Sequence, residues 1–476
     1  MFESRQSQSN RGRVDSLGRG CVPAGDVLGR RLAHRGRDSA LIPPHLALYG
    51  SVAAAGLIVV NWGLRALIRS RSLSAVLRHP PLLLVGLGGS FTLASAPVDA
   101  AWHAAYGRDA VLWSPPHMLI ILASTTMAIG VLAGLRPTRT GIVETAVAAL
   151  VLGSLTMAVV EYDTDVPQFQ EVFYLPVLLG TAVFAAAVVQ KLIPRRYAVT
   201  GMVAIYGAAR LVIALTLWGL GHSAPDMPMA ILGLAAMDLP LRTSRFRLAA
   251  GAAGVSLLAW AAAVLGISSL HPGAIGMVAF PTLLLFAALL ATGRRQSRAL
   301  ETTAVLLAAA VLALEPASPA RAHDPGQGTP IASALFTVTT DQAGLVQLIV
   351  GPSSDCDQFA PQRVVARRAG QTMAAPLIAV GGCRFSGVLR LPRTGRWFVY
   401  ADFMLSGRPA EGWLPVLSNR AGVTTKTGQL YRPAEQQGVS AGEIGSGVAI
   451  YASGLLLLGL ALHLIRRVPH QPGGPT

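Results

Sequence analysis

Long apolar runs without charge recur along the chain. Three of them, at 46–64, 173–190 and 248–267, contain no Asp, Glu, Lys or Arg. A helix of about 20 apolar residues can cross the roughly 30 Å hydrocarbon core of a bilayer. Such runs predict a bundle of about 10–11 transmembrane helices. The candidate spans lie near 46–64, 80–98, 116–135, 141–160, 173–193, 198–219, 229–241, 248–267, 274–292, 301–316 and 445–465.

The pattern changes between residues 323 and 440. Apolar and polar residues alternate there in short stretches, such as 334–338, 344–350 and 397–400, and Gly or Pro residues separate the stretches. Alternation with a period of two between turn residues is typical of antiparallel strands. The sequence therefore predicts a mostly α protein, in which a polytopic helical bundle carries an exported all-β sandwich domain before its last span.

These changes of pattern divide the chain into five parts. Arg, Ser and Gly dominate the first part, which is typical of a disordered segment. The parts are a basic tail at 1–44, the transmembrane bundle at 45–318, the β-sandwich at 323–440, a C-terminal transmembrane helix at 445–465 and a cytoplasmic tail at 466–476.

Composition and charge agree with a membrane protein. Hydrophobic residues make up 52% of the chain and charged residues only 13%, about half the charged share of a soluble domain, which excludes a typical soluble enzyme. The net charge of +16 comes mainly from Arg residues, and clusters of Arg occupy every second loop between spans. Because basic loops stay on the cytoplasmic side, this pattern indicates a multi-pass protein of the plasma (inner) membrane with an extracytoplasmic β-domain. It does not indicate nucleic-acid binding.

Residues 294–323 resemble a secretory signal within the chain. A basic cluster from Arg294 is followed by an apolar stretch and then by Ala320-Arg321-Ala322, which is the order of a cleavable signal. Cleavage would make His323 the first residue of the exported part, and an ordinary spanning helix is the alternative. Either interpretation exports the β-domain, where an oxidising compartment favours a disulfide between Cys356 and Cys383.

The most informative polar residues lie at the predicted outer membrane boundary. Asp99 and His103 are four residues apart and share a helix face if the second span continues through them. His117 follows Pro115 and Pro116 at the start of the next span, so a helical hairpin would bring it towards the first pair. Two imidazoles and one carboxylate suit copper, zinc or iron(II). The alternative is that these side chains are ordinary interfacial and capping residues.

The segment from Asp99 to His117 resembles the metal-site region of the C subunit of the copper membrane monooxygenases, the particulate methane and ammonia monooxygenase family. The shared order is Asp-x3-His, then Arg108-Asp109, then a Pro-containing turn that ends in His. The resemblance covers about 20 residues and implies that Asp99, His103 and His117 bind copper. The interval between the two histidines is one residue longer than in the family, and Pro116 replaces a small polar residue.

Further residues could support or supply such a site. Trp102, Tyr106 and Asp109 are candidates for contacts behind the ligands. On another outward loop, His222, Met227 and Met229 could hold copper(I), although packing is the alternative for the methionines. A sandwich that begins at His323 resembles exported copper-binding domains and the soluble part of the monooxygenase B subunit, or it is a disulfide-bonded module without metal.

Several charged residues interrupt the apolar runs. Glu144, Arg210 and Asp238 lie in or near predicted spans, where an ionisable group marks a pathway or an internal pair. Arg210 and Asp238 are predicted to neutralise each other. The acidic loop at 161–171 is predicted to be solvated or to attract cations.

The leading hypothesis is an integral membrane copper protein with an outward-facing Asp/His/His site. It could oxidise a small apolar substrate arriving from the lipid, in the manner of a copper monooxygenase and with other membrane subunits. It could instead take up, deliver or confer tolerance to copper without enzymatic turnover. A membrane scaffold without metal is the third alternative.

Overall fold

The computed structural model describes residues 43–106, 112–135, 140–220, 224–292, 329–353, 356–392, 395–418, 421–433 and 440–466. A long helix, α2 (Pro43–Ser70), and the five-residue α3 (Leu73–Leu77) come first. The basic tail, the candidate span at 301–316 and the signal-like segment fall outside the described residues.

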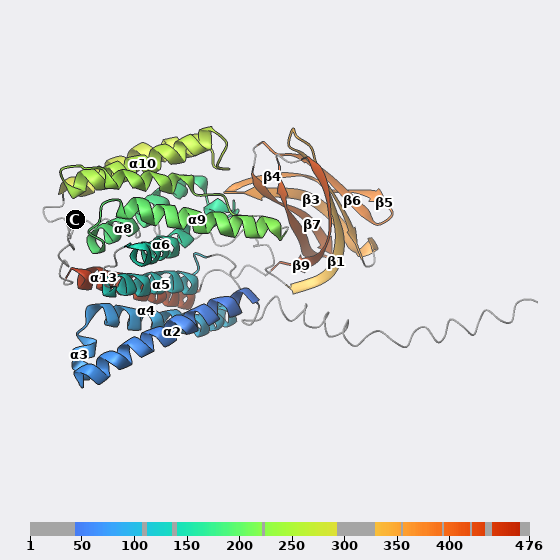
Figure 1. Cartoon of the computed structure of the whole chain (residues 1–476). Helices are drawn as coiled ribbons and strands as arrows, with labels where there is room; N and C mark the ends of the chain where they lie inside the picture. The colour runs from blue at the N-terminus through green and yellow to red at the C-terminus, as the bar shows by residue number, and fades with distance from the viewer. Residues whose placement is uncertain are drawn as a thin grey trace, which may run out of the picture. The chain divides into compact units, whose positions relative to one another are not determined.

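The helical part consists of antiparallel hairpins (Figure 1). Its further elements are α4 (Pro80–Tyr106), α5 (Pro115–Gly134), α6 (Ile142–Thr156), η1 (Met157–Val159), α7 (Val160–Asp163), η2 (Glu171–Phe173), α8 (Tyr174–Leu192), α9 (Ala198–Gly219), η3 (Met229–Asp238), α10 (Ser244–Val264) and α11 (Pro272–Thr292). Among the described residues, seven helices are long and apolar enough to cross a membrane, including α13 (Ala441–Ile465) after the β-domain. The predicted polytopic membrane bundle is therefore confirmed.

The run near 229–241 forms a ten-residue 3₁₀ helix, η3, instead of a full-length α-helix. It packs tightly on α10, because a Cβ placed on Gly233 would lie 2.1 Å from the carbonyl carbon of Gly254. Two glycines facing each other allow backbones to approach this closely. The apolar run is therefore buried against a neighbouring helix.

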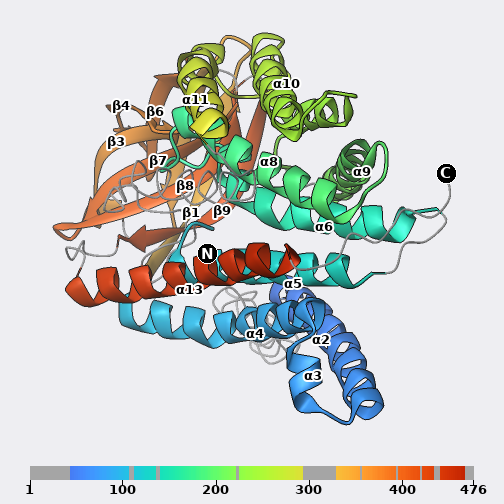
Figure 2. The same ribbon diagram turned by 90° about the vertical axis from the view of Figure 1, so that its left-hand side faces the viewer.

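The last helix, α13, returns to the first part of the bundle. It packs against α4 and α5, and Figures 1 and 2 show the three helices side by side. Gly454 of α13 faces α5, where an added Cβ would lie 2.8 Å from Leu122. Helix α13, which follows the β-domain in sequence, thus packs with two helices from before that domain.

The β-domain contains nine antiparallel strands. They are β1 (Thr329–Thr340), β2 (Leu345–Pro352), β3 (Phe359–Arg368), β4 (Gln371–Pro376), β5 (Ile378–Gly381), β6 (Arg384–Arg390), β7 (Arg396–Leu405), β8 (Arg408–Leu417) and β9 (Gly422–Arg432). They form one sheet in the order β4-β3-β7-β8-β9-β1-β2-β6-β5. The sheet nearly closes on itself, since β4 at one edge also contacts β6. The predicted all-β domain is confirmed.

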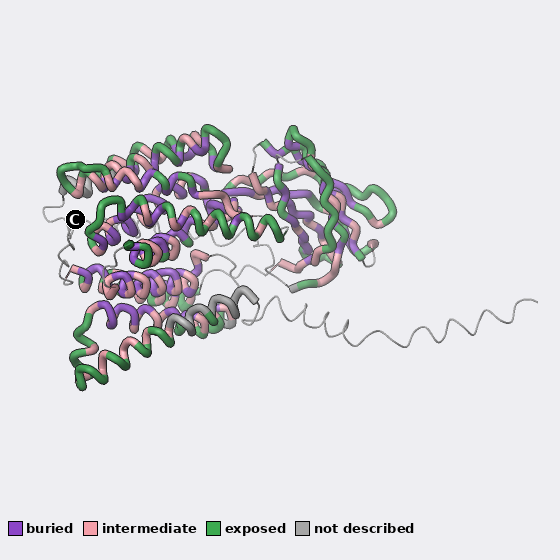
Figure 3. The backbone as a smooth tube through the Cα atoms, viewed as in Figure 1, coloured by how far each residue is buried: buried purple, intermediate pink, exposed green. Residues whose placement is uncertain are grey.

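Alternate residues of these strands fill the interior of the domain (Figure 3). The largest fully buried apolar side chains of this core are Trp397, Phe336 and Phe403. The predicted disulfide joins Cys356 to Cys383. It ties the short 3₁₀ helix η4 (Cys356–Gln358) to the turn before β6.

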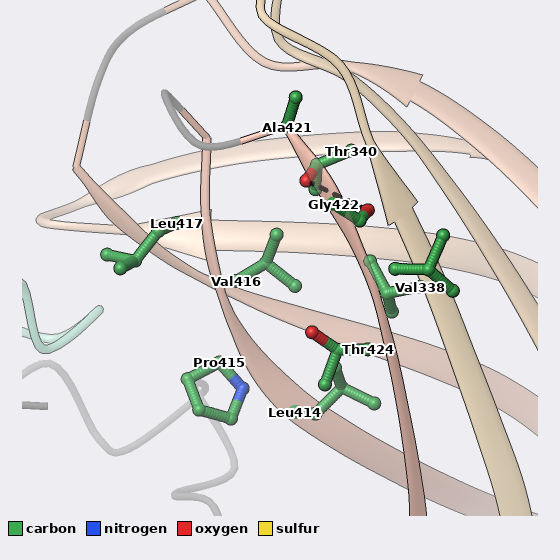
Figure 4. A pocket seen from close by; sticks show the side chains of 10 residues that line it. Val338, Thr340, Leu414, Pro415, Val416, Leu417, Ala421, Gly422 and Thr424 are labelled. Atoms are coloured by element: carbon green, nitrogen blue, oxygen red, sulfur yellow. Dashed lines mark hydrogen bonds between the residues drawn. The ribbon is translucent and has the colours of Figure 1, made fainter. Parts of the chain in front are cut away.

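The sheet is weakest between β8 and β9, which pair at Glu411 and Tyr431. Beyond this pair the strands diverge, and a pocket of about 370 Å³ opens between their far ends. Figure 4 shows its lining, which includes Val338, Leu414 and Val416 from the core and the hydroxyl-bearing Thr340 and Thr424.

Candidate metal centre

Helix α4 carries two of the three predicted ligands. It runs without interruption from Pro80 to Tyr106, although Pro97 lies inside it. Asp99 and His103 are therefore one turn apart on the same face, as their spacing predicts. Nε2 of His103 lies 3.3 Å from Oδ1 of Asp99.

Helix α5 supplies the third predicted ligand, His117. Pro115 and Pro116 occupy its first two positions, where the missing backbone N–H groups cost nothing because these donors have no helical partner. His117 therefore lies in the first turn of α5. Its Nε2 atom is 3.4 Å from the same Oδ1 of Asp99.

Two glycines let α4 and α5 approach closely enough for this. A Cβ on Gly88 would lie 2.6 Å from the backbone nitrogen of Met127, and a Cβ on Gly130 would lie 2.8 Å from Leu84 and Val85. Small residues at such positions allow tight helix pairing in membranes. Helices α4 and α5 therefore pack as closely as the three-residue site requires.

The three side chains converge as metal ligands do. One ligand atom from each side chain lies within 4.8 Å of the ligand atoms of the other two. Among the described residues, Asp99, His103 and His117 are the His, Cys, Asp or Glu side chains that form a group of three this close together. Oδ1 of Asp99 is buried and makes no hydrogen bond in the described part of the chain. Both imidazoles lie close to this oxygen, but neither is oriented to donate a hydrogen bond to it.

The observed separations fit a bound transition metal. A tetrahedral site with ligand distances of about 2.1 Å places its ligand atoms about 3.4 Å apart, close to the 3.3 and 3.4 Å found from Asp99 to the two imidazoles. Side-chain exposures of 26–29% leave the group reachable by an ion. Three protein ligands leave a coordination position for water or a substrate.

Two of the predicted supporting residues adjoin the centre. Trp102 is buried and its ring lies 4.7 Å from that of Tyr106. The Tyr106 hydroxyl accepts a hydrogen bond from Ser446 of α13 at 3.1 Å. Asp109 lies outside the described residues, so its role stays a prediction.

The predicted accessory copper residues are separate from the centre or undescribed. Met227 lies two residues before η3 and Met229 begins it, and η3 packs against α10 and α9. His222 and His323 lie outside the described residues. A second copper site therefore stays a prediction.

The acidic segment at 161–171 is not a solvated loop. Glu161, Asp163, Asp165 and Glu171 are all buried. Arg210 contacts Asp163 at 3.3 Å and donates to the backbone oxygen of Asp226. The predicted pairing of Arg210 with Asp238 is therefore wrong.

Asp238 instead accepts hydrogen bonds from the backbone nitrogen and the hydroxyl of Thr200, at 2.7 and 2.8 Å. Thr200 lies in the first turn of α9, where unpaired backbone N–H groups attract a carboxylate. The helix terminus thus provides Asp238 with partners that side-chain charge alone did not reveal.

The β-domain contributes a cation to the acidic segment. The fully buried Arg368 of β3 donates to Asp165 and to Glu171, each at 2.9 Å, and also contacts the backbone oxygen of Ser269. The backbone nitrogen of Arg396 donates to the other oxygen of Asp165. Burial raises the pKa of Asp165, while the Arg368 guanidinium opposes the shift.

These contacts form a joint between the helical bundle and the β-domain. Backbone nitrogens of the β3–β4 turn, Ala369 and Gly370, donate to the backbone oxygens of Asp165 and Pro167. The sequence gives no sign of the role of Arg368, because β3 carries exposed, half-buried and buried Arg residues, at 363, 367 and 368, and nothing in the local pattern marks the buried one.

Comparisons with protein-family models, with curated proteins and with solved structures gave no match.

Proposed function

We propose that this protein is an integral membrane copper protein, in which Asp99, His103 and His117 bind the ion at the outer end of α4 and α5. The convergence of these three ligand atoms, with Oδ1 of Asp99 lying 3.3 and 3.4 Å from the two imidazoles, supports the proposal. Two imidazoles and a carboxylate fit copper as well as zinc or iron. The resemblance to the copper membrane monooxygenases favours copper.

The chain's own residues would hold the ion and keep a coordination position open. A copper ion there would supply the redox chemistry needed to oxidise a small apolar substrate with dioxygen. The apolar faces of the surrounding helices suit a substrate that arrives from the lipid. The Arg-rich loops favour an extracytoplasmic location of this centre and the β-domain at the plasma membrane.

Metal analysis of the purified full-length protein tests the binding proposal. After loading with copper, the wild type should retain about one copper ion per chain. The His103→Ala/His117→Ala variant should retain none. His463→Ala is the matched control, because His463 is an exposed histidine in the last turn of α13. Equal copper content in all three proteins, or none in the wild type, would refute the site.

A second measurement separates an enzyme from a copper-handling protein. Copper-dependent consumption of oxygen with small hydrocarbons, lost in the double variant, would support oxidation. Accumulation of copper in cells that express the wild type, without oxygen consumption, would support copper uptake or delivery by the same site.

Sidedness has its own test. In a Cys21→Ser background, a membrane-impermeant maleimide should label Lys426→Cys, which is exposed on β9, in intact cells. It should label Arg69→Cys at the end of α2 only after permeabilisation. The reverse pattern would place the β-domain in the cytoplasm.

A further inference from the structure

The short turn before α5 determines where His117 lies. Leu112, Trp113 and Ser114 lead into Pro115 and Pro116, and His117 follows in the first helical turn. The side chain of Ser114 makes no capping hydrogen bond to α5. The turn is therefore held in place by contacts with other helices.

The consecutive short helices η1 and α7 hold one side of this turn. The buried carboxylate of Glu161 accepts a hydrogen bond from the backbone nitrogen of Leu112 at 2.5 Å. The indole nitrogen of Trp113 donates to the backbone oxygen of Ala158 at 2.8 Å. Two consecutive residues of the turn are thus bonded to the same short stretch of chain.

Helix α13 holds the other side. The hydroxyl of Tyr451 donates to the backbone oxygen of Trp113, across 338 residues of sequence. One turn earlier, Gly447 provides room for the site-bearing helices, because an added Cβ would lie 3.4 Å from both Trp102 and Pro115. Helix α13 therefore packs closely against both site-bearing helices at this position.

We propose that Glu161 and Tyr451 are positioning residues of the metal centre, which fix the backbone of the turn and thereby the place of His117 relative to Asp99 and His103. The inference rests on the proposed function. It makes α13, which follows the β-domain in sequence, a structural part of the centre. Partners that orient ligands commonly change metal affinity 10–100-fold when they are removed.

Three variants of the full-length protein test the inference by copper(II) competition titration and electron paramagnetic resonance. Tyr451→Phe removes one hydroxyl and keeps the ring, and we expect about 10-fold weaker binding with altered copper hyperfine splitting. Glu161→Leu should do the same or more. Glu161→Gln should restore much of the affinity, because the amide oxygen can still accept the hydrogen bond from Leu112.

Ser453→Ala is the matched control on α13, because the Ser453 hydroxyl donates to the backbone of its own helix at Ala449. It should bind copper like the wild type and give the same spectrum. If Glu161→Leu fails to fold, Tyr451→Phe alone decides the question, since it removes a single oxygen atom.

The outcomes separate this inference from the proposed function. A wild type that binds copper, together with Tyr451→Phe and Glu161→Leu proteins of unchanged affinity and spectrum, would overturn the positioning roles and leave the metal site standing. A wild type without copper would overturn the proposed function and this inference with it.

Discussion

Glu411 carries a carboxyl group into a buried position on β8. Burial raises the pKa of Glu411 to about 7, the carboxylate of its cross-strand neighbour Asp402 adds to the shift, and Arg367 opposes it. A carboxyl whose pKa is higher in the folded state binds more protons there than in the unfolded chain. Its contribution to stability is therefore greatest at low pH and is lost as pH rises.

Glu411→Gln should remove this pH dependence. Relative to the wild type, the variant should gain stability between about pH 4.5 and 7, by at most about 3 kcal/mol. Thermal unfolding of both proteins across pH 4–8 measures the difference directly. A difference between the two proteins that does not change with pH would contradict the raised pKa of Glu411.

The hairpin of α4 and α5 depends on residues that have no functional group at all. Gly88 faces the backbone of α5, whereas Gly86 on the same helix has no atom within 4 Å of an added Cβ. Alanine substitutions at the two positions therefore separate the effect of close helix packing from that of helix propensity, because each adds the same methyl group to α4.

Gly88→Ala should separate α4 from α5 and weaken copper binding, because its Cβ would meet the backbone of Met127. Overpacking of this kind costs about 1–3 kcal/mol, and the displaced His117 should lower copper affinity at least several-fold. Gly86→Ala should leave both stability and affinity near the wild-type values. The measurements are thermal unfolding and copper titration, and equal behaviour of the two variants would argue against the packing role of Gly88.

The buried joint around Arg368 connects the two kinds of structure in this protein. Its guanidinium contacts two carboxylates from the bundle, and Gly395 leaves the space it needs, since a Cβ there would lie 2.6 Å from Nε of Arg368. Such buried pairs are costly to break, because each lost partner leaves an uncompensated charge away from water. The β-domain is thus held to the bundle by Arg368 as well as by its chain connections.

Arg368→Met should destabilise the protein by about 3–5 kcal/mol, since Asp165 and Glu171 would lose their buried cation. It should also speed hydrogen exchange in the turn formed by Ala369 and Gly370. Arg363→Met on the same strand is the matched control, because the Arg363–Asp402 pair is solvent-accessible and worth less than about 1 kcal/mol. Similar losses in both variants would show that the joint contributes no more than a surface pair.

Local periodicity in the sequence determined the main elements. The length of the apolar runs predicted the spanning helices, and alternation predicted the strands of the β-domain. The four-residue spacing of Asp99 and His103 placed them on one face, and the Pro-Pro start of α5 brought His117 back towards them. Each of these features depends on neighbours within one or two turns of chain, so the sequence displays it directly.

The tertiary structure alone decided which charges meet and what supports the site. Arg210 pairs with Asp163 and not with Asp238. Arg368 forms a buried ion pair with Asp165, in a segment whose composition suggested that it was solvated. Tyr451 donates a hydrogen bond to the backbone of Trp113, which is far away in sequence. The run at 229–241 forms a 3₁₀ helix that packs on α10, where Gly233 and Gly254 face each other. These outcomes depend on contacts between residues far apart in sequence, and such contacts form only when the packing of whole helices and strands brings the partners together.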